Sequence, residues 1–239
     1  MLRNICLLIT FFFFINVSLL KAQQPDEQSV AKLEAHLNEL YGPDQFLVNG
    51  VRYYNTHISM DGHKFYGEDE FTRGKLVLED NQYHDVFLKY NLLDQQLILQ
   101  HFFNKQVYYE IILSNSRISE FELDGKIFRK CYFPSTDTRF FQVLGDGDLA
   151  CYYHWTKMLV TTYTESYRQG EFSNQKRKSY LLWQSKLYEF KGARSFARIF
   201  AQDQSQVLRY IRNNRIRIKK ATDAEMKELI IQCNRIIRS

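Results

Sequence analysis

Apolar and polar residues alternate along much of the chain between residues 45 and 190, with the two-residue period that gives a β-strand one buried face. Asn49-Gly50 and Asp61-Gly62 are typical of two-residue hairpin turns. The first turn would place Val48 opposite Val51 in a pair of strands. Further strands are expected at residues 71–78, 83–90, 96–102, 107–113, 118–123, 126–133, 140–144, 149–156, 158–163, 180–183 and 187–190.

Short polar turns separate these strands, and no helical pattern lies between them. Neighbouring strands joined in this way must run antiparallel. About a dozen strands in meander order would leave exposed edges unless the sheet curls or folds over itself. We therefore predict a mainly β (α+β) protein with an antiparallel β-meander at residues 45–190, curled into a barrel or a sandwich. A polar, basic stretch near residues 169–178 is expected to be a loop.

Helical patterns flank this β-domain. Residues 23–44 carry apolar positions at helical spacing that end at Gly42-Pro43, which predicts a short N-terminal helix. In residues 191–239 the period returns to 3.6, and Thr222 and Glu225 have the spacing of a capping box. We expect this basic C-terminal segment to form helices whose apolar sides pack on the β-domain.

The first residues have the pattern of a secretory signal peptide. Arg3 precedes an apolar stretch at residues 5–20, and the small residue Ala22 follows it. That stretch is shorter than the roughly 20 residues of a membrane-spanning helix, and no later segment is apolar enough to cross a bilayer. We therefore predict that residues 1–22 are removed by cleavage near Ala22. The mature chain is then periplasmic or secreted, without a transmembrane segment.

Composition and charge narrow the class of protein. With 45% hydrophobic and 15% aromatic residues, the chain is expected to be globular. Residues 23–130 carry 11 basic and 17 acidic side chains, whereas residues 176–239 carry 16 basic and 5 acidic ones. The basic last quarter suits an anionic surface such as lipid headgroups or acidic polysaccharide. The alternative is that its helices present Lys and Arg only to water. A nucleic-acid partner is not expected, because export contradicts it and no recognition module is present.

The mature chain has three cysteines, an odd number in a compartment where disulfides can form. A strand is expected between those of Cys131 and Cys151. In a meander the two cysteines would then lie two strand spacings of about 4.8 Å apart, beyond the reach of a disulfide. We expect free, buried thiols, and a bridge between Cys131 and Cys151 stays open if the intervening residues form a loop.

No residue spacing indicates a metal site or a cofactor. The six histidines show no H-x-H, HExxH or Cys-His spacing. A hairpin at Asp61-Gly62 would point His57 and His63 to opposite faces of the sheet, so that they would not share a metal ion. We therefore predict no metal site and no cofactor.

Signals for catalysis are equally sparse. Ser173 and Lys176 have the spacing of a serine and lysine pair, but they lie in a polar stretch that would not desolvate the lysine. Glu68-Asp69-Glu70 and Asp146-x-Asp148 resemble acid and base pairs or calcium ligands, yet carboxylates are typical of solvated turns. Catalytic and partner-binding residues are therefore unknown at this stage, and catalysis is less expected than binding.

Aromatic residues are unusually frequent, with 19 Phe and 16 Tyr. Tyr and Trp exposed on a rigid sheet would suit a sugar ring or a peptide, since each combines an apolar face with a hydrogen-bonding tip. The alternative, which we favour, is that these residues are strong strand formers and fill the core.

Several stretches resemble exported proteins of unknown function found in Bacteroidota. They are the leader ending in Lys21-Ala22-Gln23, residues 83–99 (YHDVFLKYNLLDQQLIL), residues 119–128 (SEFELDGKIF) and residues 180–234. The resemblance implies a periplasmic or envelope-associated location, and it supplies no catalytic residues.

These observations lead to one functional hypothesis and two alternatives. The hypothesis is a non-catalytic, envelope-associated protein that binds a protein or glycan partner through its antiparallel sheet. The first alternative is a hydrolase whose site is assembled from distant strands, since missing local motifs do not exclude catalysis. The second is a carrier of an apolar ligand inside a β-barrel.

Overall fold

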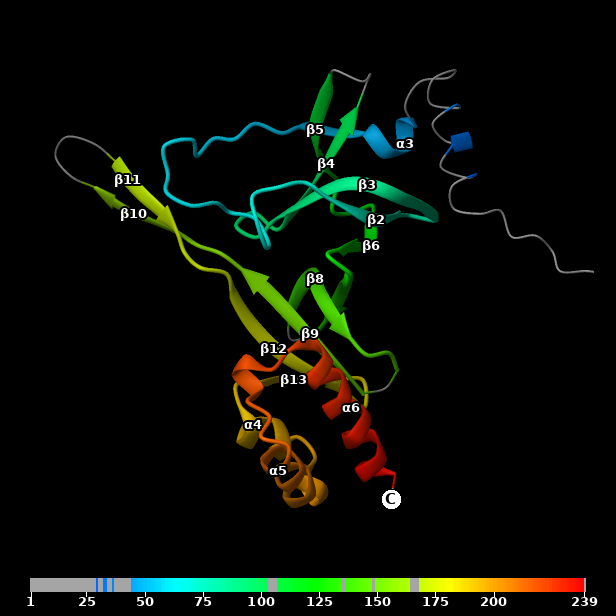
Figure 1. Cartoon of the computed structure of the whole chain (residues 1–239), viewed down its shortest axis with the longest axis vertical. Coiled ribbons are helices and arrows are strands. Elements are labelled where there is room, and N and C mark those ends of the chain that lie inside the picture. Colours follow the sequence, from blue (N-terminus) through cyan, green and yellow to red (C-terminus); the bar gives the residue numbers. More distant parts are fainter. Residues whose placement is uncertain are drawn as a thin grey trace, which may run out of the picture. The chain divides into compact units, whose positions relative to one another are not determined.

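The structure is a computed structural model that describes residues 44–102, 107–134, 136–147, 149–163 and 168–238, together with Ser29, Lys32, Leu33 and His36 (Figure 1). The predicted signal peptide lies outside the described residues, and so does most of the predicted N-terminal helix. Met1–Asp44 and Gln45–Ser239 form two compact units, of which the second contains the fold and the candidate sites.

An 11-stranded antiparallel sheet dominates the second unit, in the order β1-β5-β4-β3-β2-β6-β7-β8-β9-β12-β13. A separate two-stranded sheet consists of β10 and β11. Strands account for 46% of the chain and helices for 24%, so the prediction of a mainly antiparallel β protein is confirmed. The strands are β1 (Gly50–Arg52), β2 (Thr72–Leu78), β3 (Asn81–Asn91), β4 (Gln96–Phe102), β5 (Tyr108–Leu113), β6 (Ile118–Leu123), β7 (Lys126–Phe133), β8 (Thr136–Leu144), β9 (Leu149–Thr156), β10 (Leu159–Tyr163), β11 (Arg168–Phe172), β12 (Lys176–Trp183) and β13 (Lys186–Phe190).

The sheet is not a closed barrel. Its order begins at β1 and ends at β13, and these two edge strands do not pair with each other in the described part of the chain. The order also departs from a simple meander in three places: β1 pairs with β5, β6 pairs with β2, and β12 pairs with β9 across the inserted β10 and β11. Short turns correctly predicted hairpins between sequence neighbours, but they do not specify which edge the next hairpin joins.

The predicted hairpin at Asn49-Gly50 is wrong. Val48 ends the short helix α3 (Gln45–Val48), and Val51 belongs to β1, which pairs with β5. This arrangement buries Leu47 in the core and joins β1 to an existing sheet edge. A two-stranded hairpin offers neither advantage, because it is only marginally stable by itself.

The predicted hairpin at Asp61-Gly62 is also absent, although Gly62 has the positive φ of 75° that suits a turn. Asp61 instead bridges to β11, since its N–H donates to the Gly170 carbonyl and its own carbonyl accepts the N–H of Phe172. β11 lies inside the stretch expected to be a loop. Its sequence RQGEF has no apolar alternation, and its position depends on antiparallel pairing with β10.

Helices follow the last strand of the sheet. They are α4 (Ala193–Arg198), the 3-10 turn η1 (Ala201–Asp203), α5 (Gln204–Asn213), the 3-10 turn η2 (Ile218–Lys220) and α6 (Asp223–Ile237). The capping box at the start of α6 is confirmed, because Thr222 Oγ1 accepts the N–H of Glu225 and the Glu225 carboxylate accepts the N–H of Thr222. The helices share one hydrophobic core with strands β8, β9, β12 and β13. Four helix residues are fully buried in this core: Phe196, Val207, Leu229 and Cys233. None of the described helices is long and apolar enough to cross a membrane.

A second core, rich in aromatic rings, lies between β2, β3, β4, β6, β7 and β8. Phe121 and Phe128 stack with their ring centroids 4.9 Å apart, and the rings of Tyr90 and Phe140 pack edge-on against Phe121. Trp155 on β9 packs against both cores. The main use of aromatic residues is therefore core filling, as favoured from the sequence.

Cys131, Cys151 and Cys233 are free thiols. Strand β8 lies between the strands of Cys131 and Cys151, which confirms the strand predicted there. Cys151 and Cys233 are buried, whereas Cys131 is half-buried, so the expectation of burial is wrong for one of the three. Burial raises the pKa of Cys151 and of Cys233 to about 12, which keeps both thiols protonated and unreactive.

Candidate functional site

Two regions bring charged residues together: a set of lysines beneath an irregular loop, and a basic groove beside the C-terminal helices. The loop extends from Tyr53 to Phe71, between β1 and β2, and we call it the 53–71 loop. Its middle pairs with the end of β3, since the N–H of Tyr66 donates to the Tyr90 carbonyl at 2.8 Å and the Lys64 carbonyl accepts the N–H of Leu92 at 2.9 Å. The loop therefore has a defined path over the sheet.

The loop residue Lys64 and the β3 residue Lys89 each have a carboxylate partner. Lys64 is 4% exposed, and its Nζ lies 3.7 Å from Asp94 Oδ2 and 5.3 Å from the ring centroid of Tyr53. The Nζ of Lys89 donates to Asp69 Oδ1 at 2.7 Å and lies 4.4 Å from the ring centroid of Phe65. Both lysines thus combine an ion pair with an aromatic face, an arrangement that compensates for their loss of water.

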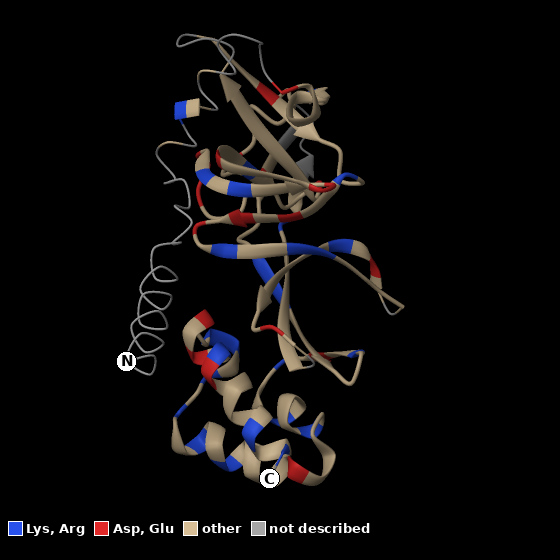
Figure 2. Ribbon diagram, turned by 90° about the vertical axis from the view of Figure 1, so that its right-hand side faces the viewer, with Lys and Arg blue, Asp and Glu red and all other residues tan. Residues whose placement is uncertain are grey.

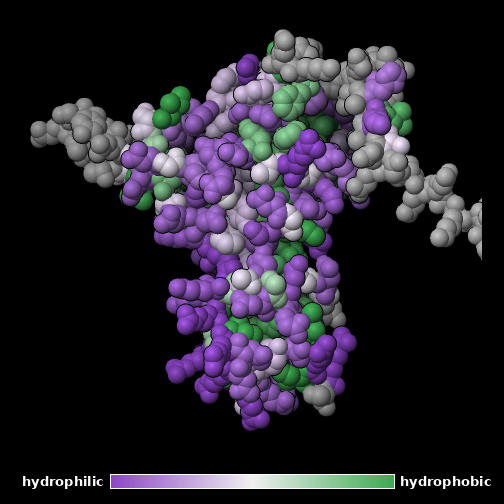
Figure 3. Space-filling view, viewed as in Figure 1, coloured by the Kyte–Doolittle hydropathy of each residue, from purple (hydrophilic) through white to green (hydrophobic). Residues whose placement is uncertain are grey.

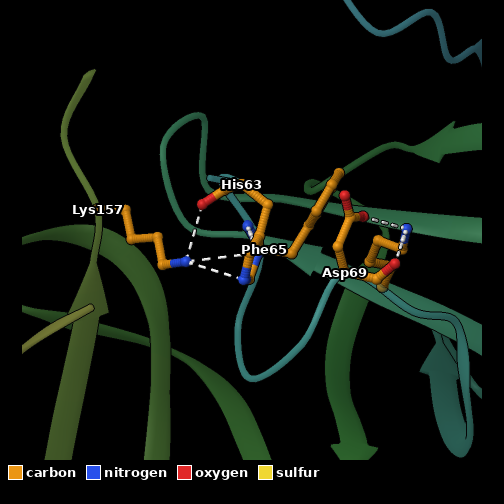
Figure 4. Close-up of polar contacts among 5 residues, drawn as sticks. His63, Phe65, Asp69 and Lys157 are labelled. Atoms are coloured by element: carbon orange, nitrogen blue, oxygen red, sulfur yellow. Dashed lines mark hydrogen bonds and ion pairs between the residues drawn. The ribbon is translucent and has the colours of Figure 1, made fainter. Parts of the chain in front are cut away.

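Lys157, in the connection between β9 and β10, has a different environment (Figure 4). It is 9% exposed, and its Nζ donates to the carbonyl oxygen of His63 at 2.8 Å. The same nitrogen lies 3.4 Å from Nδ1 and 3.5 Å from Nε2 of the His63 ring. Among the described residues, no carboxylate lies within ion-pair distance of Lys157. Burial lowers the pKa of Lys157, and the more distant Glu68 and Asp69 partly offset that effect.

The hydrogen bonds of His63 specify its protonation. Its Nδ1 accepts the backbone N–H of Phe65 at 3.2 Å, and an amide N–H can only donate. Nδ1 therefore carries no proton, and the neutral ring holds its proton on Nε2. Burial, followed by the charge of Lys157, lowers the pKa of His63, which agrees with this assignment. The arrangement can hold the 53–71 loop against the β9–β10 connection as long as His63 is neutral.

The basic groove is a concave region of about 830 Å³ between the sheet and η2. Its walls come from β9, β12, the end of β13 and the residues around η2. The lining residues are Trp155, Gln175, Arg177, Lys178, Ser179, Glu189, Phe190, Lys191, Ile218, Lys219, Lys220 and Ala221.

Five of these lining residues are cations and one is a carboxylate. Lys191 lies 3.8 Å from Glu189, and both side chains are substantially exposed. No other ion pair to a groove cation occurs among the described residues. Lys and Arg positions are frequent along the C-terminal helices in Figure 2, and hydrophilic side chains cover much of the same region in Figure 3. The groove thus has a positive potential that small surface ion pairs do not cancel.

Arg177 connects the sheet to η2. Its guanidinium lies 4.0 Å from the ring centroid of Tyr153 and 5.6 Å from that of Trp155. One of its nitrogens reaches the carbonyl oxygens of Ile218 and Lys219, each at 3.5 Å. These contacts hold the backbone of η2 close to β12, so that Lys178 on the strand and Lys219 on the turn line the same groove.

The residues considered in the sequence are not brought together as a catalytic site. Ser173 Oγ donates to the Asn174 carbonyl and accepts the N–H of Met158, so it supports the turn before β12. In the Glu68-Asp69-Glu70 run, Asp69 pairs with Lys89. Asp146 lies in a turn, and Asp148 lies outside the described residues.

The histidines are also dispersed. The ring of His57 packs against Phe172 at 5.7 Å, whereas His63 faces Lys157, so the hairpin geometry expected for these two residues does not occur. Within the described ranges, no group of three His, Cys, Asp or Glu residues is placed to hold a metal ion.

The positive charge of the C-terminal quarter was visible in the sequence, but the contact between His63 and Lys157 was not. These two residues are 94 positions apart, and neither belongs to a recognisable motif. One signal was present: Lys157 stands in a short break between two apolar strands, where a cation must find a partner or reach water.

Comparison of the chain with protein-family models, with curated proteins and with solved structures finds no match in any of the three.

Proposed function

We propose that this chain is an exported, non-catalytic protein that binds an acidic polysaccharide in the basic groove. The observation that carries the proposal is the concentration of five cations around one concave region, where Glu189 is the one carboxylate among the described lining residues. The cations are Arg177, Lys178, Lys191, Lys219 and Lys220. Among the described residues, only Lys191 of these five cations has an ion pair, with Glu189, and carboxylate or sulfate groups along a polymer would supply ion-pair partners to the other four.

The shape of the site favours a chain over a flat surface. The five cations lie on the walls of a groove of about 830 Å³, which is within the size range of ligand-binding pockets in proteins. A membrane surface is broad, and it is contacted best by side chains that protrude from a protein. In this chain, Arg177 holds the backbone of η2 close to β12, so that the cations of η2 line a groove. A polymer with charges along its length can enter this groove and meet cations on both walls.

The chemistry of the groove favours binding over hydrolysis. Glycoside hydrolysis commonly needs two carboxyl groups about 5 to 9.5 Å apart on either side of the scissile bond. Among the described lining residues, Glu189 is the only carboxylate, and it pairs with Lys191. The sheet is not a closed barrel, so it does not provide the enclosed lumen that a carrier of an apolar ligand inside a β-barrel would need.

Export is part of the proposal, and the leader sequence with Arg3, the apolar stretch and Ala22 supports it. Expression of the full chain in a Gram-negative host, followed by cell fractionation and N-terminal sequencing, tests it. We expect a periplasmic product that begins near Gln23. A full-length product that stays in the cytoplasm would contradict export.

Binding is tested with the chain lacking residues 1–22, using calorimetry against a carboxylated polysaccharide, a sulfated polysaccharide and a neutral glucan at low and physiological salt. We expect binding to the acidic polymers only, with an affinity that falls as salt rises. The double variant Lys219→Glu and Lys220→Glu should reduce the affinity by at least about tenfold, which corresponds to about 1.4 kcal/mol.

The matched control is Arg209→Glu with Lys227→Glu, which makes the same change in net charge at exposed positions outside the groove. It should lose far less affinity than the groove variant. Equal losses in both variants would show that net charge, and not the groove, causes binding. Binding to anionic lipid vesicles without binding to either acidic polymer would also contradict the proposal.

A further inference from the structure

The side chain of His63 is placed between two parts of the fold that are distant in sequence. On one side it accepts the N–H of Phe65 within the 53–71 loop, and on the other it lies against the Lys157 ammonium group from the β9–β10 connection. Its ring is also stacked on Phe65, with centroids 6.3 Å apart and an angle of 16° between the planes. The ring therefore contributes to the path of the loop and to its contact with the connection.

We propose that His63 and Lys157 form an acid-labile clasp, which releases the 53–71 loop from the β9–β10 connection when His63 takes up a proton. Protonation has two consequences that act together. Nδ1 can no longer accept the N–H of Phe65, because it then carries a hydrogen itself. In addition, a cationic ring stands 3.4 Å from the Lys157 ammonium group, where like charges repel strongly in partly dry surroundings.

The other charged groups around His63 do not reverse this effect. Lys89, from β3, is a further cation that lowers the pKa of His63, and its Nζ lies 4.4 Å from the centroid of the Phe65 ring on which His63 stacks. Asp69 and Glu68, on the loop itself, favour the protonated ring, but the Asp69 carboxylate is engaged by Lys89 at 2.7 Å. The balance lowers the pKa of His63. The closed loop is therefore favoured above the ordinary histidine pKa of about 6.5 and loses stability as the pH falls below it.

The clasp is connected to the basic groove, and this part of the inference rests on the proposed function. The N–H of Gly67 in the loop donates to Oε1 of Gln175, which lines the groove. Trp155, another lining residue, lies two positions before Lys157 in the chain. Opening of the loop would remove the contact that orders Gln175, so acid is expected to weaken polysaccharide binding.

Hydrogen exchange of the mature chain tests the clasp directly. Peptides that cover residues 57–70 are followed by mass spectrometry at pH 7.5, 6.0 and 5.0, and each rate is divided by the intrinsic exchange rate at that pH. We expect the protection of the Phe65 and Tyr66 amides to fall on the order of tenfold between pH 7.5 and 5.0, because protonation of His63 removes the acceptor of the Phe65 N–H and adds repulsion from Lys157.

The variant His63→Asn separates the clasp from general acid effects. The Asn side chain can accept the N–H of the residue two positions later, but it does not titrate. Protection in His63→Asn should change less than about twofold over the same range. His84→Asn, at an exposed histidine on β3, is the matched control and should behave as the unmodified chain. Protection that does not change with pH in the unmodified chain, or that falls equally in His63→Asn, would overturn the clasp.

A second variant covers the case in which His63→Asn does not fold. Lys157→Met keeps an apolar stem and removes the charge, so the pKa of His63, followed by NMR of the ring proton, should rise. A pKa that is unchanged or lower would contradict the role given to Lys157.

The effect of the clasp on the groove is tested by the affinity for an acidic polysaccharide at pH 7.5 and 5.0. Between these two pH values, the unmodified chain should lose more affinity than His63→Asn does. A complete lack of polysaccharide binding, with the exchange result intact, would overturn the proposed function and leave the clasp standing.

Discussion

Single residues at the crowded positions of the sheet determine how closely its strands approach. Gly74 lies in β2, at an irregularity in the pairing with β3 where the register shifts before Leu76. A Cβ atom added there would overlap the carbonyl oxygen of Glu122 on the neighbouring strand β6. Backbone atoms of a paired strand cannot move aside as a flexible side chain can, so this position needs a glycine for space.

The first prediction follows from this contact. We expect Gly74→Ala to lower the free energy of unfolding by about 2 kcal/mol or more, in the range found for overpacked sites. Gly192→Ala is the control, because nothing lies within 4 Å of a Cβ there and φ is −174°, an extended conformation open to any residue. The control should cost less than about 1 kcal/mol. Urea unfolding of both variants measures the difference, and equal losses would contradict the argument from space.

Elements were predictable from the sequence where a local pattern determines them. The bounds of β4, β6, β7 and β9 agree with the expected strands because alternation and flanking turns are both clear there. The helix at Gln45–Val48 was missed because Leu47 packs into a core built from strands far along the chain. The strand at Arg168–Phe172 was missed because its sequence does not alternate and its position depends on pairing with β10 and on the bridge to Asp61. A turn dipeptide such as Asn49-Gly50 permits a hairpin, but tertiary pairing decides whether one forms.

Helix α6 provides a prediction at this scale. Thr222→Ala removes the side-chain oxygen that accepts the N–H of Glu225 at 3.2 Å. Because α6 supplies Met226, Leu229, Ile230 and Cys233 to the core shared with the sheet, fraying of its first turn is coupled to global stability. We expect a loss of about 1 kcal/mol, and Thr222→Ser should recover most of it. Thermal unfolding of the two variants compares them, and an equal loss in both would show that the hydroxyl oxygen is not what matters.

For the whole molecule, the candidate sites were less predictable than the elements. The excess of Lys and Arg in residues 176–239 was visible in the sequence. The groove itself is lined by residues of different elements, among them Trp155, Glu189 and Lys219. It could not be predicted, because the order of the strands in the sheet cannot be read from the sequence. The clasp between His63 and Lys157 depends on the path of an irregular loop, which has no periodic pattern from which to predict it.

Acid stability is a property of the whole molecule, because a titrating group buried between strands couples pH to global unfolding. His154 on β9 is 5% exposed, and burial lowers its pKa to about 4. The hydrogen bond to the Phe140 carbonyl raises this pKa, and Arg139 and Lys178 lower it further. In the unfolded chain the pKa returns to about 6.5, so the unfolded state binds the proton more readily between these two values.

Stability from the neutral His154 is therefore fully present above about pH 6.5 and is lost as the pH falls toward the pKa of the folded state. Between pH 7.5 and 5.0 we expect this residue to reduce the free energy of unfolding by about 2 kcal/mol, measured by urea unfolding at each pH. His154→Gln should flatten that part of the profile, whereas His84→Asn should leave it unchanged. His63 and His101, whose pKa values are also lowered by burial, act in the same direction, so some loss should remain in His154→Gln. An equally steep profile in that variant would show that His154 does not couple protonation to folding.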